Sequence, residues 1–139
     1  MTVGYIGFFF QAILVFSKES SLFVNMTHKR KVNIHWILNS LGLLCVLTAF
    51  GVIYYNKNSL GKDHFTSWHG LIGIITIVYT CIQFIAGHNL TILNNLFKKL
   101  TNIPYPSLAI AHATSGTFLF IMICSSMCLG NFYFNKMFL

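Results

Sequence analysis

The chain of 139 residues is 55% hydrophobic and only 8% charged. Soluble domains carry about 25% charged residues, so this composition excludes a soluble globular protein and indicates an integral membrane protein. Nine basic residues against two acidic ones give a formal net charge of +7. In a membrane protein such an excess reports topology, and no interleaving of basic and aromatic residues points to a nucleic acid as a partner.

Four apolar segments predict an all-α, multi-spanning transmembrane helix bundle that forms a single domain over residues 1–139. We expect the helices at about 3–16, 33–55, 68–91 and 107–132. The last three are long enough to cross a bilayer, which takes about 20 residues. The segment 3–16 would span only about 21 Å of a roughly 30 Å hydrocarbon core, so we expect a partial helix whose beginning is missing.

Basic residues gather in alternate loops of this topology. The loops before the second and fourth helices carry Lys29, Arg30, Lys31, Lys98 and Lys99. The loop between the second and third helices carries Lys57 and Lys62, which Asp63 offsets. The positive-inside rule therefore predicts that loops 17–32 and 92–106 face the cytosol.

Three histidines, His35, His69 and His112, each lie near the start of a long apolar segment. Ionisable groups inside such segments are costly and suggest function. The predicted topology places His35 and His112 at similar depth near the cytosolic face, and His69 near the opposite face. Two imidazoles that face each other across a bundle core can supply both axial ligands of a haem, which favours one-electron transfer. The alternative is that each is a core histidine satisfied by a backbone carbonyl.

Other polar and small residues have weaker interpretations. We expect His28 to be a solvated member of the basic run, and His88 to be either a rival ligand or an interfacial residue. His64 either helps to bind an acceptor on the non-cytosolic side or is a plain loop histidine. Small residues that let helices approach, or that leave room for a flat macrocycle, are Gly42, Gly70, Gly73, Ala113, Ser115 and Gly116. The cysteines Cys45, Cys81, Cys124 and Cys128 are expected to be packing residues.

Several motifs resemble the cytochrome b561 family, and most closely its small cytochrome b561 domain-containing transmembrane reductases. They are Ile34-His35-Trp36, the stretch Leu60-Gly61-Lys62-Asp63-His64-Phe65-Thr66-Ser67-Trp68-His69-Gly70, and Ala111-His112-Ala113-Thr114-Ser115-Gly116. Leu14 to Ser17 and Glu19 to Leu22 are similar to the end of that family's second helix. The resemblance covers almost the whole chain, in the same order.

The resemblance implies six transmembrane helices and two b haems, one near each face, each held by two histidines from alternate helices of the central four. His35 and His112 match the cytosolic pair. His69 matches one ligand of the other haem, whose second ligand in the family lies before the point where this chain begins. The family's last helix would follow Leu139, so we expect a version shortened at both ends.

The resemblance further implies that electrons pass from cytosolic ascorbate to monodehydroascorbate or ferric iron across an internal membrane, of the endoplasmic reticulum or of cytoplasmic vesicles. The basic run Lys29, Arg30 and Lys31 fits an ascorbate monoanion, although it is equally a topogenic cluster at the lipid head groups. Lys62 and His64 are the corresponding substrate candidates on the far side. The lipid bilayer and a second copy in a homodimer are the other expected partners. The alternative function is a catalytically incomplete membrane protein that acts as a structural or partner-binding subunit.

Overall fold

The computed structural model describes residues 1–17, 25–92 and 103–138. All regular structure in these residues is helical and none is a strand, which confirms the all-α expectation. The chain forms two compact units, Met1–Asp63 and His64–Leu139. Lys18, the stretch 19–22 and the pair Lys98 and Lys99, which entered the topology and resemblance arguments, lie outside the described residues.

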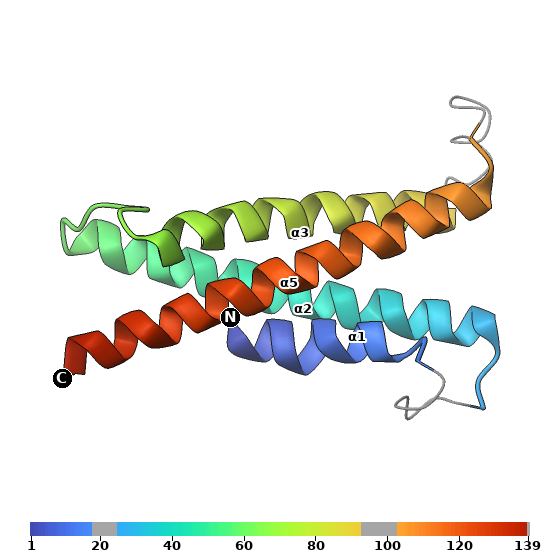
Figure 1. Ribbon diagram of the computed structural model, residues 1–139, viewed down its shortest axis with the longest axis horizontal. Helices are drawn as coiled ribbons and strands as arrows, with labels where there is room; N and C mark the ends of the chain where they lie inside the picture. The colour runs from blue at the N-terminus through green and yellow to red at the C-terminus, as the bar shows by residue number, and fades with distance from the viewer. Residues whose placement is uncertain (18–24, 93–102, 139) are drawn as a thin grey trace. The chain divides into compact units, whose positions relative to one another are not determined.

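The first unit is a short helical rod packed on a long helix (Figure 1). The rod is π-helical over Val3–Phe9 (η1) and α-helical over Phe10–Leu14 (α1), and the long helix α2 covers His28–Ser59. Two glycines bring η1 and α2 close. A Cβ built on Gly4 would lie 2.8 Å from Val46 Cγ2 and 3.0 Å from the Gly42 carbonyl oxygen, and one on Gly42 would lie 2.9 Å from the Phe9 ring. Small residues allow such an approach where lipid supplies no hydrophobic drive.

Helix α2 begins at His28, five residues before the predicted start at about 33, so the basic run forms its first turn. Its other end is a Schellman motif. Gly61 has a φ of 61°, the left-handed conformation that glycine adopts without penalty. The amide of Lys62 bonds the Lys57 carbonyl at 3.0 Å and that of Gly61 bonds the Asn58 carbonyl at 3.2 Å, which satisfies two of the last carbonyls of the helix.

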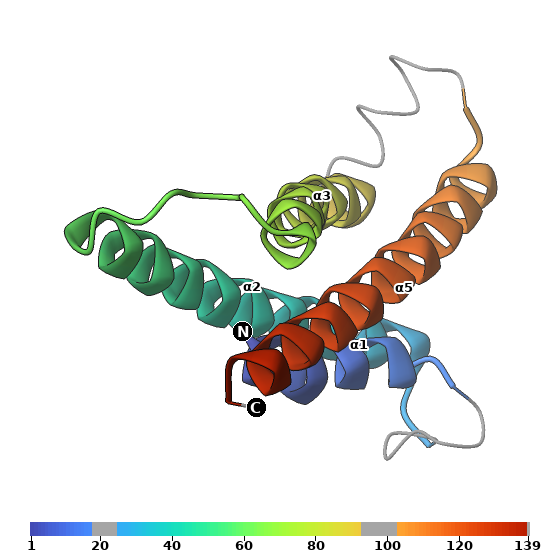
Figure 2. The ribbon, with the colours of Figure 1, turned by 60° about the vertical axis from the view of Figure 1, so that its left-hand side comes forward.

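The second unit contains α3 (Trp68–Ile92) and α5 (Tyr105–Phe138), which pack on each other. Figure 2 shows α3 nearly end-on, with α5 running obliquely past it. Ser67 caps α3, because its Oγ accepts the Gly70 amide at 3.1 Å. Pro104 and Pro106 flank the first residue of α5, where a missing N–H removes no helical hydrogen bond. The helices run antiparallel, because His69 near the start of α3 meets Ser126 in the second half of α5, and Gln83 farther along α3 meets His112 near the start of α5.

Three helices, His28–Ser59, Trp68–Leu90 and Tyr105–Tyr133, are long and apolar enough to cross a membrane, which confirms the expected full spans. Their outward faces carry large apolar side chains such as Leu44 and Ile110. Exposed hydroxyls on these helices bond the carbonyl four residues earlier; they belong to Ser40, Thr48, Thr114, Thr117 and Ser125. Such bonds hide a hydroxyl from hydrocarbon, where an unsatisfied polar group is costly.

The tight contact between η1 and α2 gives a testable expectation. Gly4→Ala places a methyl against the Gly42 backbone and should lower the free energy of unfolding by roughly 1–3 kcal/mol, the usual cost of overpacking. Gly51→Ala in α2 is the matched control, since a Cβ there meets nothing within 4 Å. That variant should be neutral or gain up to about 1 kcal/mol. Detergent-mixture unfolding followed by circular dichroism measures both, and equal losses would contradict the packing argument.

Candidate functional site

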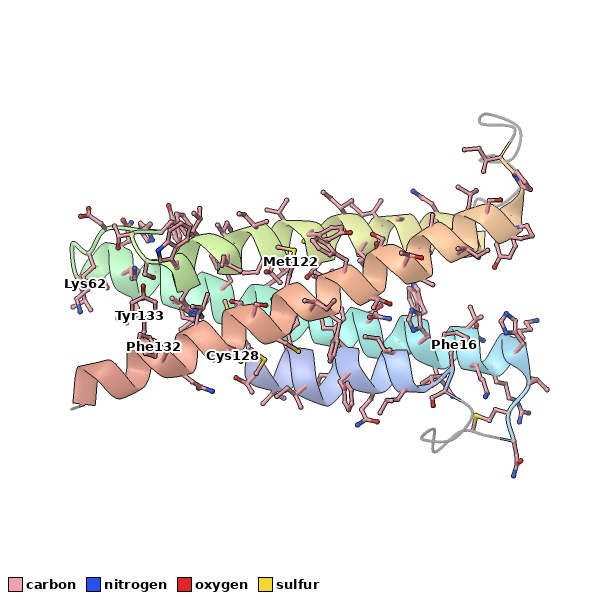
Figure 3. The ribbon with its side chains drawn as sticks, viewed as in Figure 1. Phe16, Lys62, Met122, Cys128, Phe132 and Tyr133 are labelled. Carbon is pink, nitrogen blue, oxygen red and sulfur yellow. The ribbon has the colours of Figure 1, made fainter. Side chains whose placement is uncertain are left out.

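His35 lies in the third turn of α2 and is hydrogen-bonded to the neighbouring rod. Its Nδ1 is 2.8 Å from the Ala12 carbonyl oxygen. Where α1 ends, the Phe16 amide bonds the carbonyl of Ile13 and not that of Ala12. The Ala12 carbonyl, in the last turn of α1, can therefore accept a bond from the His35 side chain. A carbonyl can only accept, so Nδ1 carries the proton and the Nε2 of the neutral ring is unprotonated. Phe16, labelled in Figure 3, packs edge-on with ring centroids 5.3 Å apart.

His69 repeats this arrangement in the second unit. The Ser67 cap sets it in the first turn of α3, and its Nδ1 is 2.9 Å from the carbonyl oxygen of Ser126 on α5. The ring therefore also has its proton on Nδ1 and its Nε2 unprotonated. A Cβ built on Gly130 would lie only 3.0 Å from its Cε1, so the ring rests directly on the α5 backbone.

His112 on α5 rests on α3 in the same way, but its hydrogen bonding differs. A Cβ on Gly87 would lie 2.9 Å from its Cε1. Its Nδ1 faces the side-chain nitrogen of Gln83 at 3.1 Å, and that same nitrogen bonds the His112 carbonyl oxygen at 2.6 Å. At Nδ1 the ring therefore meets a side-chain amide, whereas Nδ1 of His35 and of His69 meets a backbone carbonyl.

Each of the two helices places a histidine against a glycine of the other helix. His69 of α3 meets Gly130 of α5, and His112 of α5 meets Gly87 of α3. Each histidine and the glycine on its own helix are eighteen positions apart, which is five helical turns, so both lie on one face about 27 Å apart along the axis. The two histidines therefore lie at opposite ends of the α3–α5 pair.

Sequence reasoning missed Gly87, Gly130 and Gln83. The repeated spacing of histidine and glycine was visible in the sequence, but only the pairing of α3 with α5 gives it meaning. Three of the small residues expected to matter do lie at this interface. Gly73 faces the Ser126 hydroxyl, Gly116 faces the Gln83 amide, and the Ser115 hydroxyl is 2.6 Å from that of Tyr79.

The basic run is placed where a helix attracts anions. Lys29, Arg30 and Lys31 lie in the first turn of α2, and the first helical bond runs from the Lys31 amide to the Thr27 carbonyl. Amide groups at a helix start lack helical partners, and the helix dipole is positive there. Cations at this end are disfavoured by the helix itself, so the run is not explained by helix stability. It presents three cationic side chains next to amide groups that lack helical partners, a combination that suits a bound anion.

The remaining candidates lie in the α2–α3 connection or on α3. Lys62 is exposed directly after the Schellman glycine (Figure 3). His64 is half-buried with its ring 5.8 Å from that of Phe65, which has a φ of 58°. His88 stacks on Phe84 with ring centroids 6.4 Å apart. The four cysteines are free thiols, and Cys124 and Cys128 are exposed on α5.

Curated proteins and family models give matches over most of the chain. It is 36% identical over 121 residues to the bovine transmembrane reductase CYB561D2, covering 86% of this chain and 52% of that protein. The mouse CYB561D2 is also 36% identical, over 88% of this chain and 53% of its own length. The mouse probable transmembrane reductase CYB561D1 is 30% identical over 86% of the chain. The chain thus spans about half the length of the curated relatives it matches, and no solved structure matches it.

The eukaryotic cytochrome b561 family model matches residues 1–138, a range that contains both units and every described helix. The match includes the three histidines at the ends of the apolar spans. Spans of this length and composition make the chain an integral, multi-pass membrane protein. Taken together, these findings show that the chain belongs to the cytochrome b561 family.

Proposed function

We propose that this chain is a haem b-binding electron-transfer protein of a membrane. It passes electrons from cytosolic ascorbate to monodehydroascorbate or ferric iron on the other side. The family is one of b-type cytochromes, and the relatives in the comparison are named transmembrane reductases. His35 and His112 are the proposed axial ligands of the haem near the cytosolic face, and His69 is a proposed ligand of a second haem near the opposite face.

The observation that carries the proposal is the hydrogen bond from His35 Nδ1 to the Ala12 carbonyl. Histidines that bind metals almost always donate their other ring N–H to a carbonyl, carboxylate or water, because this fixes the tautomer and the ring plane. The bond leaves His35 Nε2 as a lone pair, the form an iron ligand requires. His69 has the same form through Ser126.

Glycines also make room for the rings of His69 and His112 against the facing helix. Glycine at 87 and 130 removes the Cβ atoms that would press on the two rings. The pairing of His35 with His112 rests on topology, since α2 and α5 enter the membrane from the same side in an alternating bundle. Haem b, when held by two histidines, supplies a carrier for single electrons with no open position for oxygen. The protein's part is to fix the two rings and to exclude water.

The donor site is the proposed role of Lys29, Arg30 and Lys31. Ascorbate is an anion at neutral pH, and it gives up one electron and one proton on becoming monodehydroascorbate. The three cations and the free amides of the first turn of α2 attract the anion and orient it. On the far side, Lys62 and His64 are proposed to receive the acceptor, where ferric iron takes one electron, or monodehydroascorbate takes one electron and one proton. The proposed location is a membrane of the endoplasmic reticulum or of cytoplasmic vesicles, with a homodimer as the assembly.

Haem binding through His35 and His112 is tested by difference spectra. Membranes containing the chain should give a low-spin b-type signal when reduced, and the signal of this haem should vanish in His35→Ala and in His112→Ala. His88→Ala is the matched control, because His88 is also on an apolar helix but stacks on Phe84. A signal that survives both ligand substitutions, or that is lost in the control, overturns the assignment. Absence of any signal in the unaltered chain would favour the structural or partner-binding alternative.

The glycine under the His112 ring gives a second test. Gly87→Ala forces a methyl to within 2.9 Å of the ring carbon, so the ring must move and the haem signal should broaden or fall. Gly73→Ala on the same helix is the control, since its Cβ would make an ordinary contact of 3.7 Å with the Ser126 hydroxyl. The comparison is made on purified protein by haem content per chain. Equal haem content in the two variants would contradict a close packing role for Gly87.

The donor site is tested by replacing Lys29, Arg30 and Lys31 together with Gln. Reduction by ascorbate should slow by several-fold and lose much of its dependence on salt, because exposed charges act over about 8 Å at physiological ionic strength. Reduction by dithionite should change less. Lys57→Gln, at the other end of α2, is the control. Since loop charges set topology, protease accessibility must first show that orientation is kept. Unchanged stopped-flow traces with ascorbate would leave the run with a topogenic role only.

A further inference from the structure

A chain of hydrogen bonds across the α3–α5 interface ends at His112. It joins Tyr79 and Gln83 on α3 with Ser115 and His112 on α5. The Ser115 hydroxyl donates to Gln83 Oε1 at 2.9 Å. Its only proton is thereby used, so the Tyr79 hydroxyl is the donor to Ser115 Oγ at 2.6 Å, and it shares its proton with the Ser115 carbonyl oxygen at 3.3 Å. The bonds therefore run in one direction, from Tyr79 through Ser115 to the amide of Gln83.

The orientation of the Gln83 amide is fixed at both of its ends. Oε1 accepts from Ser115, and Nε2 lies 2.6 Å from the His112 carbonyl oxygen, which can only accept. An amide turned over would place two acceptor oxygens against each other at that distance. The amide nitrogen can only donate, so the His112 Nδ1 at 3.1 Å from it must be the acceptor.

His112 is therefore in the opposite tautomer to His35 and His69. An Nδ1 that accepts has no proton, so the proton of the neutral ring is on Nε2. The carbonyls of Ala12 and Ser126 hold the proton of the other two rings on Nδ1. A metal at Nε2 of a neutral His112 requires the proton to move to Nδ1. There it would point at the N–H of Gln83, so the amide must turn or withdraw.

We propose that Gln83 is a positioning residue that holds His112 in the Nε2–H tautomer and so opposes its ligation of haem until the amide turns. This inference rests on the proposed function, in which His112 is an axial ligand. In this account the rings of His35 and His69 already have the tautomer that an iron ligand needs. The ring of His112 must first exchange its hydrogen bond with Gln83. No net protonation change is involved, because one ring proton moves from Nε2 to Nδ1.

The tautomer is measured directly in the haem-free full chain, labelled with ¹⁵N-histidine, in detergent micelles at mildly alkaline pH where the rings are neutral. Two-bond ¹H–¹⁵N correlations distinguish the two tautomers, and His112→Ala identifies the signal. We expect Nε2–H for His112 and Nδ1–H for His35 and His69. Gln83→Met, close to Gln in shape but with no N–H, should remove the preference at His112. An Nδ1–H signal for His112 in the unaltered chain overturns the inference.

Haem titration of the same variants measures how Gln83 affects the affinity for haem. Loss of an ordinary supporting partner of a ligand histidine weakens metal binding by about 10–100-fold. Gln83→Met should instead bind haem at least as tightly as the unaltered chain. Asn39→Leu is the matched control, because it also removes an amide that bonds a ligand histidine. The Asn39 amide bonds the His35 carbonyl at 2.7 Å, whereas the His35 ring keeps its bond to Ala12. A tenfold loss in Gln83→Met alone overturns the inference. Failure of every variant to bind haem overturns the proposed function, and the tautomer signals then decide the inference by themselves.

Discussion

The structure depends on the constraint that hydrocarbon offers no hydrogen-bond partner, so every polar group in a span must find one inside the protein. Outward hydroxyls such as Thr48 meet it by bonding their own helix, and buried Thr76 and Thr80 do the same. Histidine cannot, because its two ring nitrogens are too far from its own backbone carbonyls to be satisfied together. His35 and His69 therefore each reach a carbonyl of the neighbouring helix with Nδ1.

The need to reach a carbonyl of a neighbouring helix explains where the small residues lie. A side chain bonds a carbonyl of a neighbouring helix only if the backbones come close, and close approach in lipid needs residues without bulk. Gly130 sits under the His69 ring and Gly87 under the His112 ring, while Gly4 and Gly42 bring η1 against α2. Glycine in a helix costs about 1 kcal/mol relative to alanine. The cost is offset here by contacts that a Cβ would block, which is the physical reason for glycine at these positions.

Helix ends supply the remaining chemistry. A carbonyl in the last turn of α1 is open to His35 because the chain turns away at Phe16. The first turn of α2 places three cations beside amide groups that lack helical partners. The Ser67 cap sets His69 one residue inside α3.

The sequence by itself determined the all-α membrane class, the three full spans and the family, because apolar length, charge and short motifs are local properties of the chain. It placed the start of α2 five residues late, since a basic run resembles a loop although lysine and arginine are good helix formers. Only the tertiary structure decided which carbonyls hold His35 and His69, that Gly87 and Gly130 support the rings, and that Gln83 holds His112 differently. These depend on which residues of α3 and α5 meet, and the pairing of two helices is set by packing along their whole length, which no local pattern encodes.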